Sequence, residues 1–227
     1  MTPLVTSRAA LAVSRYLAAD LLRSQRFLLP VLAYLTVVMV LMGGDPGPPP
    51  QLWGASVGLL YPISAWLTIV VANAEDPSAR HVTVTAAGGW LRVQIGVLIT
   101  CLGADLILLA AAVLRPLLPL GGTPYPYTPR MLLIGALAHL AAAGAGTALG
   151  LLFGPPIVAR IGWSAVATGL AVLMTVTQPW LPPVGTAIRT LEQPHQPLLG
   201  LALGAAFSVL IAGLACATVV RIAPRRS

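Results

Sequence analysis

The sequence predicts an all-α integral membrane protein with six transmembrane helices, an N-terminal amphipathic interfacial helix and both termini in the cytoplasm. Three observations support this fold class. The 227 residues are 57% hydrophobic and only 8% charged, whereas soluble domains are about 25% charged. Apolar runs of about 20 residues, the length that crosses a bilayer, recur along the chain. The thirteen basic residues are distributed unevenly between the segments that connect these runs.

Six apolar runs are predicted to span the membrane. They occupy residues 27–43, 52–72, 93–114, 131–152, 157–178 and 198–220. Proline and glycine mark most of the boundaries, as expected for turns and loops. Only Gly154-Pro155-Pro156 separates the fourth run from the fifth, which predicts a helical hairpin. The alternative is that one of these two runs is not a separate span.

The basic residues predict the orientation of the chain, because cytoplasmic loops carry an excess of them. With the N-terminus inside, the cytoplasmic segments hold ten: Arg8, Arg15, Arg23, Arg26, Arg80, Arg92, Arg160, Arg221, Arg225 and Arg226. The outer loops hold only Arg115, Arg130 and Arg189. We therefore expect a multi-pass protein of the cell membrane. Its parts are an amphipathic helix (1–26), a six-helix domain (27–220) and a basic cytoplasmic tail (221–227).

The basic residues are all arginine, and the absence of lysine excludes several chemistries. A P-loop needs its lysine to reach the nucleotide phosphates, so this chain holds no such ATP site. Two cysteines, Cys101 and Cys216, are too few for a disulfide framework or a four-cysteine metal site. No catalytic motif is present, and we expect no enzymatic activity, cofactor, metal site or nucleic-acid partner.

Two cytoplasmic segments carry helix signals. In segment 7–26, four arginines lie within about 80° on a helical wheel, opposite three apolar residues: Arg8, Arg15, Arg23 and Arg26 against Val13, Leu17 and Leu21. This pattern predicts a helix in the membrane interface with its guanidiniums toward anionic headgroups. The alternative is an irregular basic tail.

The second cytoplasmic segment follows the second apolar run. Asp76-Pro77 is typical of a helix start, with a side-chain cap and proline at the first position. Gly88-Gly89 is expected to end the helix after about eleven residues, among them Arg80 and His81. The alternative is an ordinary polar loop.

Polar residues inside the spans are candidate functional groups. Asp105 is the only acidic residue deep in an apolar run, and His139 lies at a similar expected depth, counted from Arg115 and Arg130. If their helices are neighbours, Asp105 and His139 could share a proton or form a buried ion pair. We expect Asp105 to act as a contact between helices or as a protonated, hydrogen-bonded group, with a role in a transport path as the alternative.

Gly146, Gly150 and Gly154 recur at four-residue spacing on the fourth run. Glycine at this spacing lets helices approach closely. We expect this face to pack inside the protomer, with a dimer interface as the alternative.

In layout the chain resembles a small ABC-2 type transporter permease, the membrane subunit of an ABC exporter. Segment 7–26, followed by 27–43, resembles the elbow helix and first span of that family. Residues 73–80 and 86–92 resemble the stretch that contains the coupling helix. The segment 146–160, with the later Leu181-Pro-Pro-Val-Gly, resembles the hairpin and the outer segment before the last span.

The resemblance implies an ATP-binding partner subunit that contacts Asp76, Arg80 and His81. It also implies a second permease, identical or different, and a translocation path at the permease–permease interface within the lipid bilayer. Two alternatives stay open. One is a proton-coupled secondary transporter that uses Asp105 and His139. The other is a non-transporting membrane protein that binds a partner, such as an immunity protein.

Overall fold

A computed structural model describes residues 3–43, 47–118, 125–158, 160–178, 180–193 and 197–225. Every regular element in these ranges is a helix, which confirms the all-α fold class. The α-helices are α1 (Pro3–Ser24), α2 (Leu28–Leu41), α3 (Gly54–Ala72), α4 (Pro77–Ala87), α5 (Trp90–Leu114), α6 (Pro129–Phe153), α7 (Ile161–Val176), α8 (Val184–Glu192) and α9 (Leu198–Ile222). Residues 226–227 of the expected basic tail lie outside the described ranges.

Four helical segments are long and apolar enough to cross a membrane: Gln51–Ala72, Trp90–Leu117, Pro129–Phe153 and Leu198–Ile222. A fifth span results if α1 and α2, which meet at 78°, count together. With 14 and 16 residues, α2 and α7 are about 21 and 24 Å long, less than the ~30 Å hydrocarbon core. The chain is therefore a multi-pass membrane protein with four to five candidate spans, and a sixth span stays a prediction.

The centre of the bundle is α6, which packs most extensively against α9 and α3. Its sequence explains this position, because alanine and glycine fill the buried faces. A Cβ at Gly146 would lie 2.3 Å from the Tyr61 carbonyl oxygen, and one at Gly150 would lie 2.5 Å from Thr68 Cβ. Both glycines therefore face α3 within the protomer. Gly154 instead caps the C-terminal end of α6.

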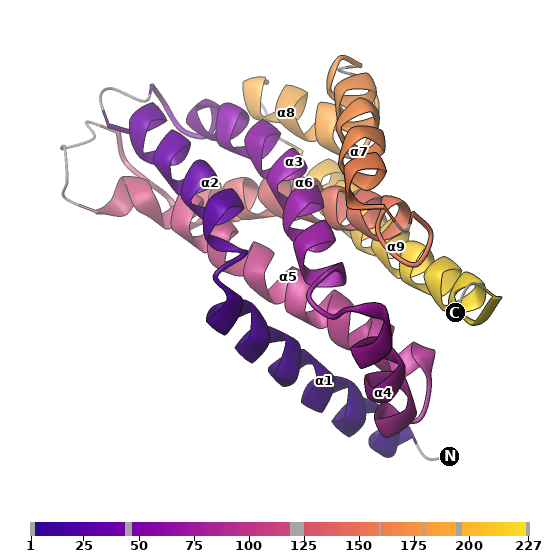
Figure 1. Cartoon of the computed structure of the whole chain (residues 1–227). Coiled ribbons are helices and arrows are strands. Elements are labelled where there is room, and N and C mark those ends of the chain that lie inside the picture. The colour runs from indigo at the N-terminus through magenta and orange to yellow at the C-terminus, as the bar shows by residue number, and fades with distance from the viewer. Residues whose placement is uncertain are drawn as a thin grey trace.

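The N-terminal segment forms the expected amphipathic helix, α1. Its apolar residues Val13, Leu17 and Leu21 are buried in a cluster with residues of α5 and neighbouring helices. Arg8 and Arg15 are exposed on the other side. Figure 1 shows α1 lying along α5. The apolar face of α1 is thus covered by protein, and its arginines remain free to meet an anionic surface.

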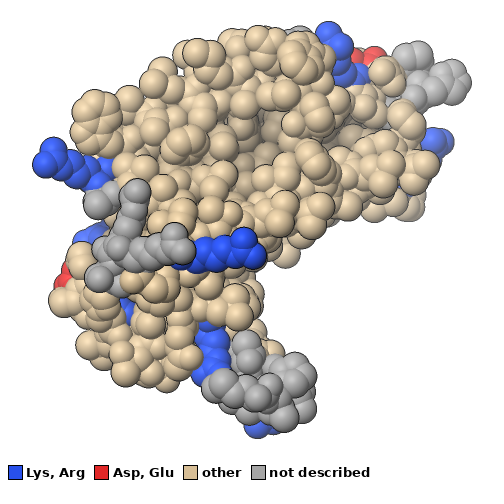
Figure 2. Space-filling model, turned by 90° about the vertical axis from the view of Figure 1, so that its right-hand side faces the viewer, with Lys and Arg blue, Asp and Glu red and all other residues tan. Residues whose placement is uncertain are grey.

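Both chain ends and α4 lie toward the same end of the long helices (Figure 1). Figure 2 looks at the molecule from this end and shows arginines spread over a surface that is otherwise mostly uncharged. Basic side chains at the ends of candidate spans are favoured beside membrane headgroups. The side of the membrane on which the termini lie stays a prediction.

Candidate functional site

The helix α4 connects α3 to α5 and has well-defined ends. The carboxylate of Asp76 accepts the backbone N–H of Ala79 at 2.8 Å and the hydroxyl of Ser78 at 2.7 Å. Pro77 occupies the first turn, where its missing N–H costs nothing. Gly88 ends the helix in the left-handed region at φ +77°, which favours glycine. The predicted eleven-residue helix is confirmed.

Three faces can be distinguished on α4, each with a different environment. The inward face is Arg80, Val84 and Ala87; the face toward α1 is Ala79, Val82, Thr83 and Ala86; the solvent face is Ser78, His81 and Thr85. Each set follows the three- and four-residue spacing of one helix face. The solvent face is polar and exposed, so it is available to a partner.

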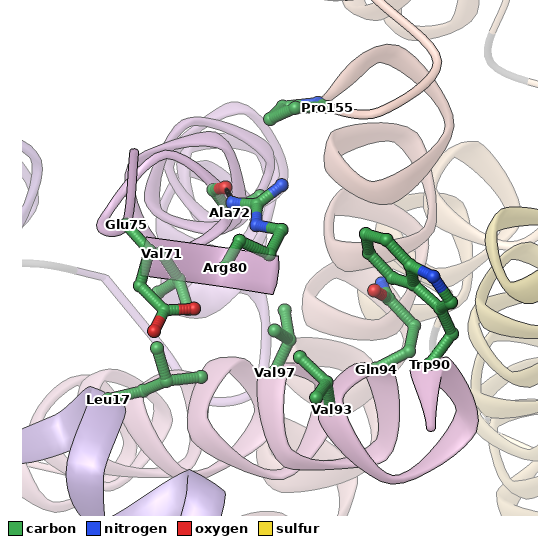
Figure 3. Close-up of a pocket in the computed structure, with 10 residues that line it drawn as sticks. All are labelled: Leu17, Val71, Ala72, Glu75, Arg80, Trp90, Val93, Gln94, Val97 and Pro155. Carbon is green, nitrogen blue, oxygen red and sulfur yellow. Dashed lines mark hydrogen bonds between the residues drawn. The ribbon is translucent and has the colours of Figure 1, made fainter. Parts of the chain in front are cut away.

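Arg80 of the inward face and Thr83 of the neighbouring face anchor α4 to the end of α3. Arg80 donates from Nη2 to the carbonyl oxygen of Ala72, the last residue of α3, whose carbonyl has no partner within its own helix. The Thr83 hydroxyl donates to the carboxylate of Glu75, which is 9% exposed. Figure 3 shows the Arg80 guanidinium turned toward Ala72 and the Glu75 carboxylate turned toward Leu17 of α1. These contacts fix α4 against the membrane domain.

A small cavity lies beside this anchor. Its volume is about 10 Å³, room for a single water molecule. Trp90 and Gln94 of α5 form part of its wall (Figure 3). Burial lowers the pKa of the Arg80 guanidinium below its ordinary value, while the nearby Glu75 carboxylate acts in the opposite direction. The anchor is thus a partly desolvated pair of opposite charges. The cavity beside it is too small to hold an organic ligand.

The structure separates the three residues expected at the partner surface. Asp76 and His81 are exposed, and the His81 ring packs edge-on against Trp90 at a centroid distance of 6.3 Å. Arg80 instead points inward, so we revise its role from partner contact to internal anchor. The contact between Glu75 and Thr83 was not predicted from the sequence, because an acceptor and a donor eight residues apart across a helix start form no recognisable motif.

A wide groove separates α1 from α4, and we call it the α1–α4 groove. Its volume is about 630 Å³. Small and apolar residues form most of its lining: Ala9, Ala12, Val13, Tyr16, Ala79, Val82, Thr83, Ala86 and Ala87. This groove was not predicted from the sequence, since it depends on how two helices far apart in the sequence are placed.

Deep in the bundle, Asp105 connects three helices. Its Oδ1 accepts the Ser64 hydroxyl of α3 at 2.7 Å, and its Oδ2 accepts the Thr147 hydroxyl of α6 at 2.8 Å. Asp105 is 2% exposed. Buried carboxyl groups need such partners, and this one has a donor for each oxygen. The arrangement is a polar contact between α3, α5 and α6.

The possible pairing of Asp105 with His139 is not formed. The Nδ1 of His139 donates to the Gly135 carbonyl oxygen at 2.7 Å, and its Nε2 lies 3.0 Å from the Ser56 hydroxyl. Asp105 meets α6 at Thr147, eight residues or about 12 Å from His139 along the helix. The two groups therefore belong to separate hydrogen-bonded sites.

The physical reason for this error lies at the outer ends of the two helices. The expected depths were counted from Arg115 and Arg130 as if both marked one level. Arg115 is buried, with its Nε 3.2 Å from the sulfur of Met39, whereas Arg130 is exposed on the first turn of α6. Counting from the two arginines therefore misaligned the helices by about two turns.

No group of three or more His, Cys, Asp or Glu side chains in the described ranges is arranged to hold a metal ion. The two cysteines are buried singly. Comparison of the chain with family models, with curated proteins and with solved structures finds no match.

Proposed function

We propose that this chain is the permease subunit of an ATP-driven exporter of the ABC-2 type. In this proposal it forms the translocation path with a second permease and is driven by a separate ATP-binding subunit. The observation that carries the proposal is α4, a short capped helix between two candidate spans. Its exposed polar face, Ser78, His81 and Thr85, suits a protein partner, while its inward face is fixed to the bundle.

The contacts of α4 supply a route for mechanical coupling. A push on the solvent face of α4 reaches α3 through the Arg80–Ala72 hydrogen bond. From α3 it reaches α6, because Gly146 brings the two backbones into direct contact. Closely packed helices transmit displacement rather than absorb it. ATP-driven closure of the partner would in this way tilt the central helices between inward- and outward-facing states.

The N-terminal helix supports the same proposal. It turns by 78° into α2, and in this proposal the bend is the junction between an elbow helix and the first span. These 227 residues contain no lysine, so the proposal requires a P-loop outside them. Both features agree with the layout of the family that the sequence resembles.

The proposal is tested by cross-linking the solvent face of α4 in native membranes. A photoreactive amino acid replaces His81, and a matched one replaces Arg189, which is exposed on α8 in the segment predicted to lie outside. We expect the first to cross-link an ATP-binding protein that copurifies with the chain, and the second to give no such product. Absence of an ATP-binding protein from both preparations contradicts the proposal.

Arg80→Glu is not a suitable variant for testing the contact between α4 and the ATP-binding partner. It would remove the donor to Ala72 and place a second carboxylate near Glu75, so it tests the anchor instead.

Transport in proteoliposomes distinguishes the two possible energy sources, ATP hydrolysis and a proton gradient. The proposal requires export that stops when ATP is withheld and persists when a protonophore is added in the presence of ATP. The opposite result would indicate a proton-coupled carrier.

A further inference from the structure

The α1–α4 groove is lined by carbon and offers few polar groups. The lining residues with hydroxyls are Tyr16 and Thr83, and Thr83 already donates to Glu75. A peptide segment in this groove would leave its backbone N–H and C=O groups without partners, which is costly. A hydrocarbon chain has no such requirement. The lining therefore favours an acyl chain over a polypeptide.

The position of α4 places the groove at one end of the candidate spans. α1 runs along α5, which is one of these spans, and α4 lies at the end of the long helices where α1 begins (Figure 1). Leu11 and Leu22 of α1 are 48% and 67% exposed, and on the helical wheel they lie next to the exposed arginines. Exposed leucine beside arginine is typical of a helix at the headgroup level. Lipid can therefore reach the groove from the bilayer.

Two arginines border the groove on the α1 side. Ala12 lines the groove, and Arg8 and Arg15 are its neighbours at i−4 and i+3 on the helix surface, about 5–6 Å away between Cβ atoms. Both arginines are exposed, and among the described residues neither makes an ion pair. Two guanidiniums beside an apolar groove match the chemistry of a phosphate group with an attached acyl chain.

We propose that the α1–α4 groove binds an anionic phospholipid of the cytoplasmic leaflet. One acyl chain lies against Ala12, Val82 and Ala86, and the phosphate pairs with Arg8 and Arg15. The lipid thereby bridges the N-terminal helix and α4. Binding to this site is independent of the proposed transport function, because it needs neither ATP nor a partner subunit.

The test is a lipid titration of the purified full chain, followed by native mass spectrometry. The probes are phosphatidylglycerol, which is anionic, and phosphatidylcholine, which carries no net charge. We expect phosphatidylglycerol to bind more tightly. We expect the double variant Arg8→Gln, Arg15→Gln to weaken its binding about 30-fold, given the usual contribution of an arginine near an anionic surface. Arg221→Gln, at the end of α9 and outside the groove, is the matched charge control.

A second variant tests the acyl site. Ala86→Trp fills the groove and should displace phosphatidylglycerol, whereas Ala19→Trp, exposed on α1 but outside the lining, should not. Phosphatidylglycerol with a photoreactive acyl chain should label Val82, Ala86 or Ala12 in the unmodified chain. Equal weakening by Arg221→Gln, or unchanged labelling in Ala86→Trp, would overturn the proposal. So would cross-linking of the groove to another protein in native membranes without any lipid labelling.

Discussion

The hydroxyl of Thr147 on α6 donates a hydrogen bond to Asp105 of α5 at a distance of 2.8 Å. Ser64 of α3 donates to the other carboxylate oxygen at 2.7 Å. One acidic side chain thus holds three helices at one level of the bundle. This explains the presence of an acidic residue in an otherwise apolar helix without requiring that it carry protons.

Removing this carboxyl group should destabilise the bundle. We expect Asp105→Ala to lower the free energy of unfolding by about 1–3 kcal/mol, since two buried hydroxyls lose their acceptor. In a Ser64→Ala, Thr147→Val background the same change should cost less, with a coupling energy of about 1 kcal/mol. Unfolding by SDS titration in bicelles measures all four proteins of this cycle. A cost that is equal in both backgrounds would contradict the assignment.

The transport role of Asp105 has a separate test. Asp105→Asn keeps one acceptor oxygen and the size of the side chain, so we expect it to fold and to transport at a rate close to that of the unmodified chain. Transport into proteoliposomes and size-exclusion chromatography measure the two properties. A folded variant without any transport would show that the charge itself, rather than the contact between helices, is required.

The close contact between α3 and α6 should be sensitive to a single methyl group. A Cβ at Gly146 would lie 2.3 Å from the Tyr61 carbonyl oxygen, so Gly146→Ala must push the helices apart. We expect a loss of about 1–3 kcal/mol in the free energy of unfolding. Gly169→Ala on α7, where a Cβ meets no atom within 4 Å, is the control and should be neutral. Equal effects at both positions would argue against close packing at Gly146.

The Asp76 cap should make α4 sensitive to acid. The backbone N–H of Ala79 and the hydroxyl of Ser78 lower the pKa of Asp76 below its ordinary value. A carboxyl group with a lowered folded-state pKa stabilises the fold fully above its unfolded pKa, near 4, and loses this effect as the pH falls through the folded pKa. We therefore expect amide exchange in α4, corrected for intrinsic rates, to accelerate several-fold below about pH 4.

The control for this effect is Asp76→Asn, which still caps the helix but does not titrate in this range. Its α4 amides should show a much smaller dependence on pH. Asp76→Ala should exchange faster at every pH. If the unmodified chain and Asp76→Asn responded alike to acid, the cap would not be the titrating group.

The anchor residue Arg80 should matter for α4 more than for the bundle. Arg80→Met keeps an unbranched side chain but removes the donor to the Ala72 carbonyl oxygen. We expect a local loss of about 1–2 kcal/mol, seen as faster hydrogen exchange in α4 with little change in α6. Arg23→Met, on the exposed side of α1, is the control. Faster exchange in α6 as well would mean that Arg80 supports the whole bundle.

Local features of the chain were predictable from the sequence. Asp76-Pro77 and Gly88-Gly89 set the ends of α4 by cap chemistry and backbone freedom, which depend on a few adjacent residues. The buried face of α1 followed from the spacing of Val13, Leu17 and Leu21.

Relations between helices were harder to predict. The partner of Asp105 depended on the relative height of α5 and α6, and buried Arg115 gave a false reference for it. The inward direction of Arg80 depended on where the last carbonyl of α3 lies. The length of an apolar run also overstates the helix it forms, as the 14-residue α2 shows.

The eleven residues of α4 face the bundle, the α1–α4 groove and the solvent on three different sides. The rotation of this helix about its axis therefore decides which residues meet which neighbour. One residue inserted before Ser78 would turn each following side chain by about 100° relative to the end of α3. Arg80 would then leave Ala72, and the three faces would exchange their neighbours. Natural variation in this segment should therefore preserve its length more strictly than the identity of its solvent-facing residues.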